Sequence, residues 1–265
     1  MKIELFGEII ADEWAWIYEL FGIPFCCPHQ VREAIRDLAP DEELILEINS
    51  PGGDVWAGFE IYGMLQACRA LTEAHIISLA ASAATTVMCG CDTVLASPVA
   101  QIMIHQPSAY VEDYLNNNDA RELKNFLDSV KASILNGYVV KSAGKATRRK
   151  FEQLVDDSTW MPVQDAMELG LVDGYLDLDD EQALSLPLTS GIRVSNAAGL
   201  SAAPKDLLER YESAVRAGSM DEVPGHPVKR PEPIPERELA ETAENLIDSW
   251  RYQAAIDLER ARADR

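Results

Sequence analysis

The strongest constraint on the fold is an alternation of short apolar strands with helical segments along the first part of the chain. The predicted strands are residues 3–10, 43–48, 74–79, 93–96 and 101–104. The predicted helices that follow or separate them are residues 31–38, 55–69 and 80–90. Strands that alternate with helices are typical of parallel βαβ units with right-handed crossovers. The sequence therefore predicts an α/β fold.

The next part of the chain continues with helices. Residues 119–139 form a long amphipathic helix, and residues 147–155 form another with Thr147 as its N-cap. A third helix runs from 163 to 169 and ends before Gly170. By contrast, residues 11–30 are rich in aromatic side chains without a helical or strand period, which indicates an irregular segment or a contact surface for another subunit.

A change of composition near residue 177 divides the chain into three parts. Residues 1–176 are expected to form one folded domain. Residues 177–235 are expected to be an irregular, proline-rich linker, because the stretch 223–235 alone carries five prolines. Residues 236–265 are charged with scattered apolar side chains, which predicts an exposed or partner-dependent helix.

Composition excludes several classes of function. The 265 residues carry a formal net charge of −21, and such an acidic surface repels phosphate backbones, so nucleic acid is not an expected partner. Neither a leader peptide nor an apolar run long enough to cross a membrane is visible. The five cysteines have no disulfide or zinc-site spacing, which indicates reduced thiols in or near the core and a cytoplasmic location.

Three residues that could contribute to a functional site lie where predicted strands end. Gly52 follows one strand, Ser82 follows the next and His105 follows a third. Because the carboxyl ends of parallel strands meet at one edge of a sheet, we expect these groups to lie close together.

Ser82 is the candidate nucleophile. A serine in the first turn of a helix lies near free backbone N–H groups, which suit a developing oxyanion. The small residues around it, Ala80, Ala81, Ala83 and Ala84, allow a substrate backbone to approach closely. The alternative is that Ser82 only caps a buried helix.

His105 and the NSPGG segment (residues 49–53) complete the candidate site. An imidazole at the end of an apolar strand can take the serine proton and return it to a leaving amine. The two glycines allow backbone conformations that aim an N–H group at a ligand. A structural histidine and an ordinary tight turn are the alternatives. No histidine pair has metal-site spacing, so a metal site has little support. The sequence implies no organic cofactor.

Four motifs carry a resemblance to a known family. NSPGG, LAASAA, MIHQP and WMPVQDAMELGLVD occur in this order and resemble the Clp protease proteolytic subunit family over residues 3–175. The aromatic N-terminal region, the short loop before MIHQP and the C-terminal extension are most similar to Clp-related head maturation proteases of tailed bacteriophages. The resemblance implies a Clp/crotonase-like fold of repeated ββα and βαβ units, with a C-terminal extension.

The resemblance implies a role for each matching residue. Ser82 matches the nucleophile and His105 the general base. Gly52 and Ala83 match the two oxyanion N–H donors, and Gly53 supports the turn. The acid position falls on Ser158 in strict register, so a one-residue shift is needed to bring in Asp157, which we predict as the third member of the triad. Asp156 is the next choice.

The predicted function is therefore that of a serine endopeptidase that cleaves capsid or scaffold proteins during phage head maturation. It would act in the bacterial cytoplasm or inside the procapsid, as a homo-oligomer of stacked rings joined through helix 119–139. Three alternatives stay open. They are a housekeeping proteolytic subunit fed by an ATP-dependent unfoldase, a crotonase-like acyl-CoA enzyme, and an inactive assembly or scaffold protein.

Overall fold

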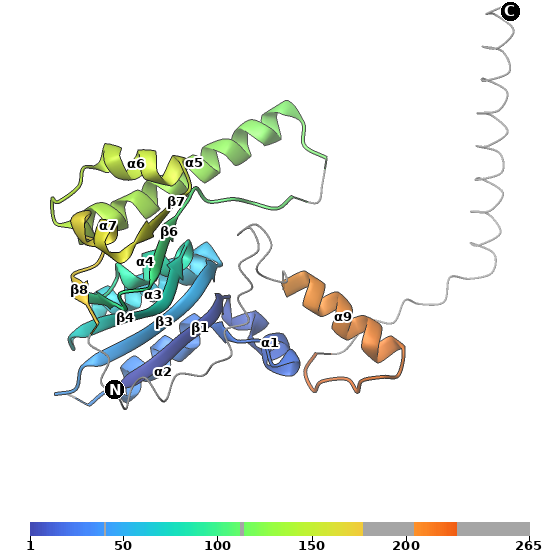
Figure 1. The fold of residues 1–265 in the computed structure, drawn as a ribbon. Helices are drawn as coiled ribbons and strands as arrows, with labels where there is room; N and C mark the ends of the chain where they lie inside the picture. Colours follow the sequence, from blue (N-terminus) through green and yellow to red (C-terminus); the bar gives the residue numbers. More distant parts are fainter. Residues whose placement is uncertain (40, 112–113, 177–203, 227–265) are drawn as a thin grey trace, which may run out of the picture. The chain divides into compact units, whose positions relative to one another are not determined.

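The structure is a computed structural model that describes residues 1–39, 41–111, 114–176 and 204–226 (Figure 1). The chain divides into two compact units, Met1–Arg210 and Tyr211–Arg265. The first unit begins with β1 (Lys2–Ile9), the 3-10 helix η1 (Asp12–Trp14), α1 (Ala15–Phe21), β2 (Phe25–Cys26), α2 (Pro28–Asp37), β3 (Leu44–Gly53), α3 (Val55–Ala67), β4 (Thr72–Ala81) and α4 (Ala83–Met88). It continues with β5 (Thr93–Ala96), β6 (Gln101–Ile104), α5 (Asn117–Ser142), α6 (Arg148–Asp156), β7 (Thr159–Pro162), α7 (Val163–Glu168) and β8 (Gly174–Tyr175).

The strands form one mixed sheet. Its main path has the order β2-β1-β3-β4-β5-β8, and β6 pairs with both β4 and β7. Every pairing is parallel except that of β6 with β7. The predicted α/β class is confirmed, and the alternation of strands with helices seen in the sequence is its cause.

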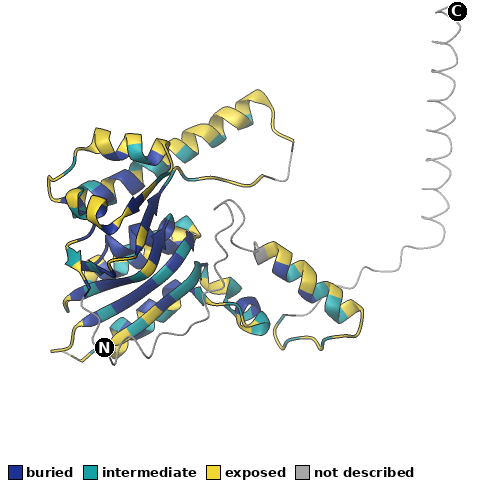
Figure 2. Cartoon of the chain, viewed as in Figure 1, coloured by how far each residue is buried: buried dark blue, intermediate teal, exposed yellow. Residues whose placement is uncertain are grey.

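The core lies between the sheet and the helices packed on it. Figure 2 shows buried residues along the strands and on the helix faces turned toward them. In β3, Leu44, Leu46 and Ile48 are buried, as strand periodicity requires. Ile61 and Leu65 of α3 belong to the same cluster. This packing fixes the strands whose carboxyl ends carry the candidate site.

Strand β3 corrects one expectation. The sequence indicated a strand that stops at NSPGG, yet β3 continues to Gly53 and pairs with β1 through Glu8↔Gly52 and Ile9↔Gly53. The pairing resumes after a register shift between Phe6 and Glu8. Gly7 lies inside that shift with φ of +87°, a conformation that favours glycine.

The aromatic segment 11–30 is also different from the expectation. It is not irregular, because it holds η1, α1, β2 and the first turn of α2. Ile17 and Tyr18 of α1 are buried, and the Tyr18 hydroxyl donates to Glu8 Oε2 at 2.6 Å. Two short helices and a two-residue strand are too brief to show a period in the sequence.

Side-chain caps set the starts of the helices near the site. The Asp54 carboxylate accepts from Ala57 N at 2.7 Å and begins α3 directly after the glycine turn. Thr147 caps α6, since its hydroxyl accepts from Lys150 N at 3.2 Å. That cap was predicted, and the structure confirms it.

The C-terminal region is described only in part. Helix α9 (Pro204–Arg216) lies within residues 177–235, so the prediction that this stretch is irregular is wrong for those residues. The predicted helix at 236–265 lies outside the described residues, and the division into three parts stays a prediction. Among the helices that the structure describes, none combines the length and apolarity needed to cross a membrane.

Candidate active site

Ser82 lies at the junction of β4 and α4. Its φ of 54° and ψ of −126° are unusual for a residue with a side chain, and they mark a sharp turn between strand and helix. The Ser82 N–H donates to the carbonyl oxygen of Met103 at 2.8 Å, which ties this turn to β6. The neighbouring Ala81 and Ala83 are small enough to let the chain turn here.

His105 follows β6, the strand beside β4. The register pairs Ala80 with Ile102 and Ala81 with Met103, so the chain ends of the two strands run side by side. His105 Nε2 lies 2.7 Å from Ser82 Oγ. The two residues that the sequence singled out are therefore within hydrogen-bond distance.

Burial controls the charge of His105. Removing part of its surface from water lowers the pKa of His105 below the ordinary 6.5, since desolvation disfavours the imidazolium form. The ring is therefore neutral near pH 7. In the tautomer with the proton on Nδ1, His105 Nε2 accepts a hydrogen bond from the Ser82 hydroxyl.

The glycine turn packs closely against Ser82. Gly52 has φ of +93°, and a Cβ added there would lie 2.6 Å from both Ala81 O and Ser82 Cβ and 2.9 Å from Ala83 N. Only glycine fits this close approach. Gly53 lies against β1, because its added Cβ would be 2.2 Å from Ile9 O.

The two N–H groups assigned to the oxyanion differ in their surroundings. Ala83 is the first residue of α4, where an N–H has no carbonyl partner within the helix. The Gly52 N–H donates to Ser50 Oγ at 3.1 Å. Ala83 is thus placed to donate to a ligand, whereas Gly52 must exchange an existing bond to do so.

The structure does not place Asp157, the predicted acid of the triad, in contact with His105. Asp157 is the exposed residue directly after α6, and within the described residues its carboxylate makes no hydrogen bond with His105. Asp156 pairs with Lys131 instead. The ladder of β6 and β7 ends with Ile104 opposite Thr159, so the next residue opposite His105 is Ser158, which has φ of +52°. The assignment of Asp157 stays a prediction.

Two residues near Ser82 were missed in the sequence. Thr85 lies one turn into α4, and its hydroxyl contacts both the Ser82 carbonyl oxygen and the Tyr138 hydroxyl. Tyr138 was interpreted only as part of the apolar stripe of helix 119–139. A hydroxyl three residues after the nucleophile was the available signal for Thr85.

The cysteines take no part in this site. All five thiols are free, and all but the half-buried Cys68 are buried. Burial raises the pKa of Cys89 and Cys91 to about 12, so both remain protonated and unreactive. Among residues 1–39, 41–111, 114–176 and 204–226, no three His, Cys, Asp or Glu side chains gather as a metal site.

Fold and site together define a class of protein: an α/β protein with a serine and a histidine within hydrogen-bond distance at the carboxyl edge of a parallel sheet. Comparison with known families makes this specific. Residues 34–178, more than half of the chain, match the Clp protease family, and the protein belongs to that family of peptidases.

Several curated relatives are named ATP-dependent Clp protease proteolytic subunit 1. That of Chlamydia muridarum is 34% identical over 156 residues, which cover 54% of this chain and 78% of the relative. That of Chlamydia trachomatis serovar D is 34% identical over 143 residues, covering 52% and 71%. That of Chlamydia pneumoniae is 32% identical over 143 residues, covering 52% and 72%. These names favour the proteolytic-subunit alternative over the predicted phage head protease.

Proposed function

We propose that this protein is a serine endopeptidase that acts as the proteolytic subunit of a Clp-type protease. The observation that carries the proposal is the 2.7 Å separation of His105 Nε2 and Ser82 Oγ at the edge of the sheet. A nucleophile and its base within hydrogen-bond reach are what covalent catalysis by serine requires.

The reaction follows from this geometry. His105 Nε2 takes the Ser82 proton while Oγ attacks the peptide carbonyl carbon, and the carbonyl oxygen becomes an oxyanion. The Ala83 N–H and an N–H of the Gly52–Gly53 turn stabilise that oxyanion. The imidazolium then gives its proton to the leaving amine, and an acyl-enzyme ester remains on Ser82. Water activated by His105 hydrolyses the ester and restores both residues.

A third residue would orient the imidazole. Asp157 is the residue proposed for this role, in which its carboxylate would accept a hydrogen bond from the Nδ1–H group of His105 and stabilise the imidazolium. It would reach Nδ1 only if the turn at Ser158 rearranged, because the exposed Asp157 carboxylate makes no bond with His105 in the described structure.

The assembly is proposed from the relatives and from surface chemistry. Proteins named ATP-dependent proteolytic subunits imply an ATPase that delivers unfolded protein chains. The exposed aromatic residues Trp56 and Phe126 supply an apolar surface for a second copy of the chain. We place the protein in the cytoplasm as a homo-oligomer, with stacked rings as the expected form.

Head maturation in a phage is the second candidate. The observation that favours it is the stretch after residue 178, which lies beyond the family match. Under this function the substrates are capsid or scaffold proteins and no ATPase is required. Cleavage of an unfolded protein only with an unfoldase and ATP supports the first candidate, and unaided cleavage of a capsid precursor supports the second.

Replacement of the nucleophile tests the reaction itself. Ser82→Ala is expected to fold normally and to lose hydrolysis of a fluorogenic peptide by several orders of magnitude. It should also lose covalent labelling by a fluorophosphonate. Ser133→Ala on the exposed face of α5 is the matched control and should retain both. Full activity of Ser82→Ala would refute the serine mechanism and would reopen the acyl-CoA and scaffold alternatives.

A further inference from the structure

Two buried hydroxyl groups connect the nucleophile to α5. Thr85 Oγ1 lies 2.6 Å from the Ser82 carbonyl oxygen, and the Tyr138 hydroxyl lies 2.6 Å from Thr85 Oγ1. Thr85 is 0% exposed and Tyr138 is 2% exposed, so water does not compete for these bonds. A chain of hydroxyls at this depth strengthens its members because the surroundings have a low dielectric constant.

The donor and acceptor in each of these hydrogen bonds follow from the chemistry of the groups. The Ser82 carbonyl oxygen can only accept, so the single Thr85 proton points to it. Thr85 Oγ1 must then accept from Tyr138, whose hydroxyl is the donor. Burial raises the pKa of Tyr138, which keeps this proton in place over the physiological pH range.

Ser82, where this chain of hydrogen bonds ends, has a strained backbone. A non-glycine residue with φ of 54° costs free energy, and such a conformation persists only where the surroundings impose it. On one side, the Ser82 N–H is held by Met103 O at 2.8 Å. On the other, the Ser82 carbonyl oxygen accepts from both the N–H of Thr85 at 2.9 Å and its hydroxyl. These bonds fix the backbone that directs Ser82 Oγ to His105.

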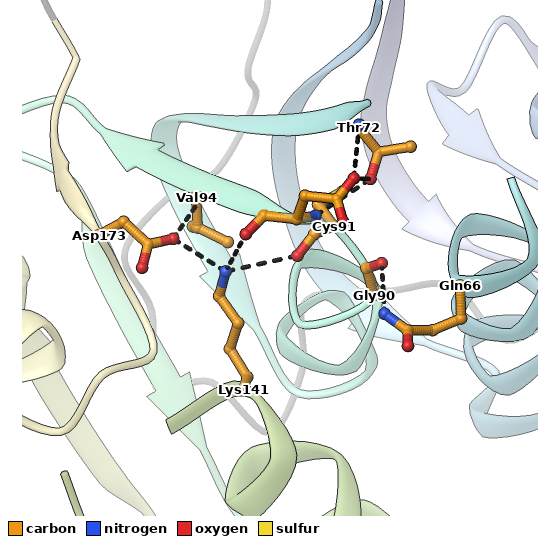
Figure 3. Close-up of polar contacts among 8 residues, drawn as sticks. Gln66, Thr72, Gly90, Cys91, Val94, Lys141 and Asp173 are labelled. Carbon is orange, nitrogen blue, oxygen red and sulfur yellow. Dashed lines mark hydrogen bonds and ion pairs between the residues drawn. The ribbon is translucent and has the colours of Figure 1, made fainter. Parts of the chain in front are cut away.

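Tyr138 is itself held in place. Its ring packs against Phe151 of α6 with centroids 5.7 Å apart. One turn later in α5, Lys141 Nζ bonds Asp173 Oδ2 at 2.8 Å and the carbonyl oxygens of Asp92 and Cys91 at 3.0 and 3.3 Å (Figure 3). Cys91 and Asp92 follow α4, so α5 contacts α4 through Tyr138 and the residues after α4 through Lys141.

We propose that Thr85 and Tyr138 are positioning residues for the nucleophile: their hydroxyls hold the Ser82 backbone in the conformation from which Oγ meets His105. This rests on the proposed serine peptidase function and adds to it a buried connection from α5 to the reacting group. If the hydroxyls instead only satisfied each other in the core, their loss would lower stability and leave the reactivity of Ser82 unchanged.

Conservative variants of Thr85 and Tyr138 distinguish a positioning role from a purely structural one. Tyr138→Phe removes one hydroxyl, Thr85→Val removes the other, and Thr85→Ser retains it. We expect Tyr138→Phe to lower kcat and the second-order rate of fluorophosphonate labelling at Ser82 by about tenfold, with KM within about twofold of wild type. Thr85→Val should lose more, and Thr85→Ser should restore most of the rate. The double variant should lose no more than Thr85→Val alone, because both changes break one chain.

Arg148→Met is the matched control. It removes the bonds from Arg148 to Asn136 Oδ1 and to the Ala132 carbonyl oxygen of α5 without touching the hydroxyl chain or the residues around α4, so it should lower the melting temperature and keep the labelling rate within about twofold. Tyr138→Phe with the wild-type labelling rate would overturn the proposal, and this result counts even if Thr85→Val does not fold. Absence of Ser82 labelling in the wild-type protein would instead contradict the proposed function.

Discussion

At the scale of single residues, the half-buried His105 couples the reaction to pH. Burial lowers the pKa of His105, and only the neutral ring accepts the Ser82 proton. We expect kcat/KM for a neutral peptide to rise with pH as His105 loses its proton, with a midpoint below 6.5. A profile measured between about pH 4.5 and 8 checks this. A flat profile, or a midpoint above the ordinary histidine value, would remove His105 from the role of base.

The same profile tests the predicted acid. Asp157→Asn is expected to lower turnover sharply, because an amide cannot stabilise the imidazolium. Loss of a nearby carboxylate should also move the midpoint to lower pH. If Asp156→Asn is the damaging change, the triad register differs by one more residue. If neither change matters, the Ser82–His105 pair works without a carboxylate at these positions.

The sequence predicted the proximity of Ser82 and His105 better than the position of the acid. Ser82 and His105 each follow a buried strand, and the topology of a parallel sheet brings such positions together. Asp157 depends on the shape of the turn after α6. There, Ser158 adopts a positive φ directly before Thr159, the first β7 residue paired with β6, a local conformation that no periodicity or composition reveals.

At the scale of elements, the local apolar pattern decided what was predictable. Strands β5 and β6 have the predicted bounds, and α5 extends the predicted helix 119–139 by only a few residues at each end. Strand β7 is as short as β5 and β6, but it was missed because its sequence TWMP ends in a proline. Its partner β6 lies far away in the sequence, so only the tertiary pairing makes it a strand.

The exposed aromatic surface predicts an interface. Trp56 of α3 and Phe126 of α5 are 55% and 48% exposed, and their ring centroids lie 6.1 Å apart. We expect Phe126→Glu to lower the oligomeric mass measured by analytical ultracentrifugation, because a charge there must be desolvated on association. Asn125→Glu adds the same charge to the preceding residue of the helix and should lower the oligomeric mass less. Equal masses for Phe126→Glu and wild type would show that this surface is not an interface.

At the scale of the whole molecule, the catalytic region is expected to work without the C-terminal part. The family match ends at residue 178, so the residues that match the Clp protease family all lie before the C-terminal part. A chain that ends at residue 180 should therefore retain hydrolysis of a small peptide. Under the head maturation candidate it should also lose incorporation into procapsids.

Limited proteolysis of the full chain provides the independent measurement. Rapid cleavage between residues 177 and 235 that leaves a stable, active core would support the expectation. A shortened chain that unfolds, or a full chain that resists digestion there, would show that the C-terminal part stabilises the catalytic region.

The pairing of β6 with β7 has a consequence for synthesis in the cell. A ribosome releases Ser82 and His105 well before it releases residues 159–162, and β6 has only β4 beside it until then. The strand that carries the base thus receives its second neighbour late in translation. We therefore expect the Ser82–His105 pair to reach its final geometry only after residues 159–162 have emerged from the ribosome.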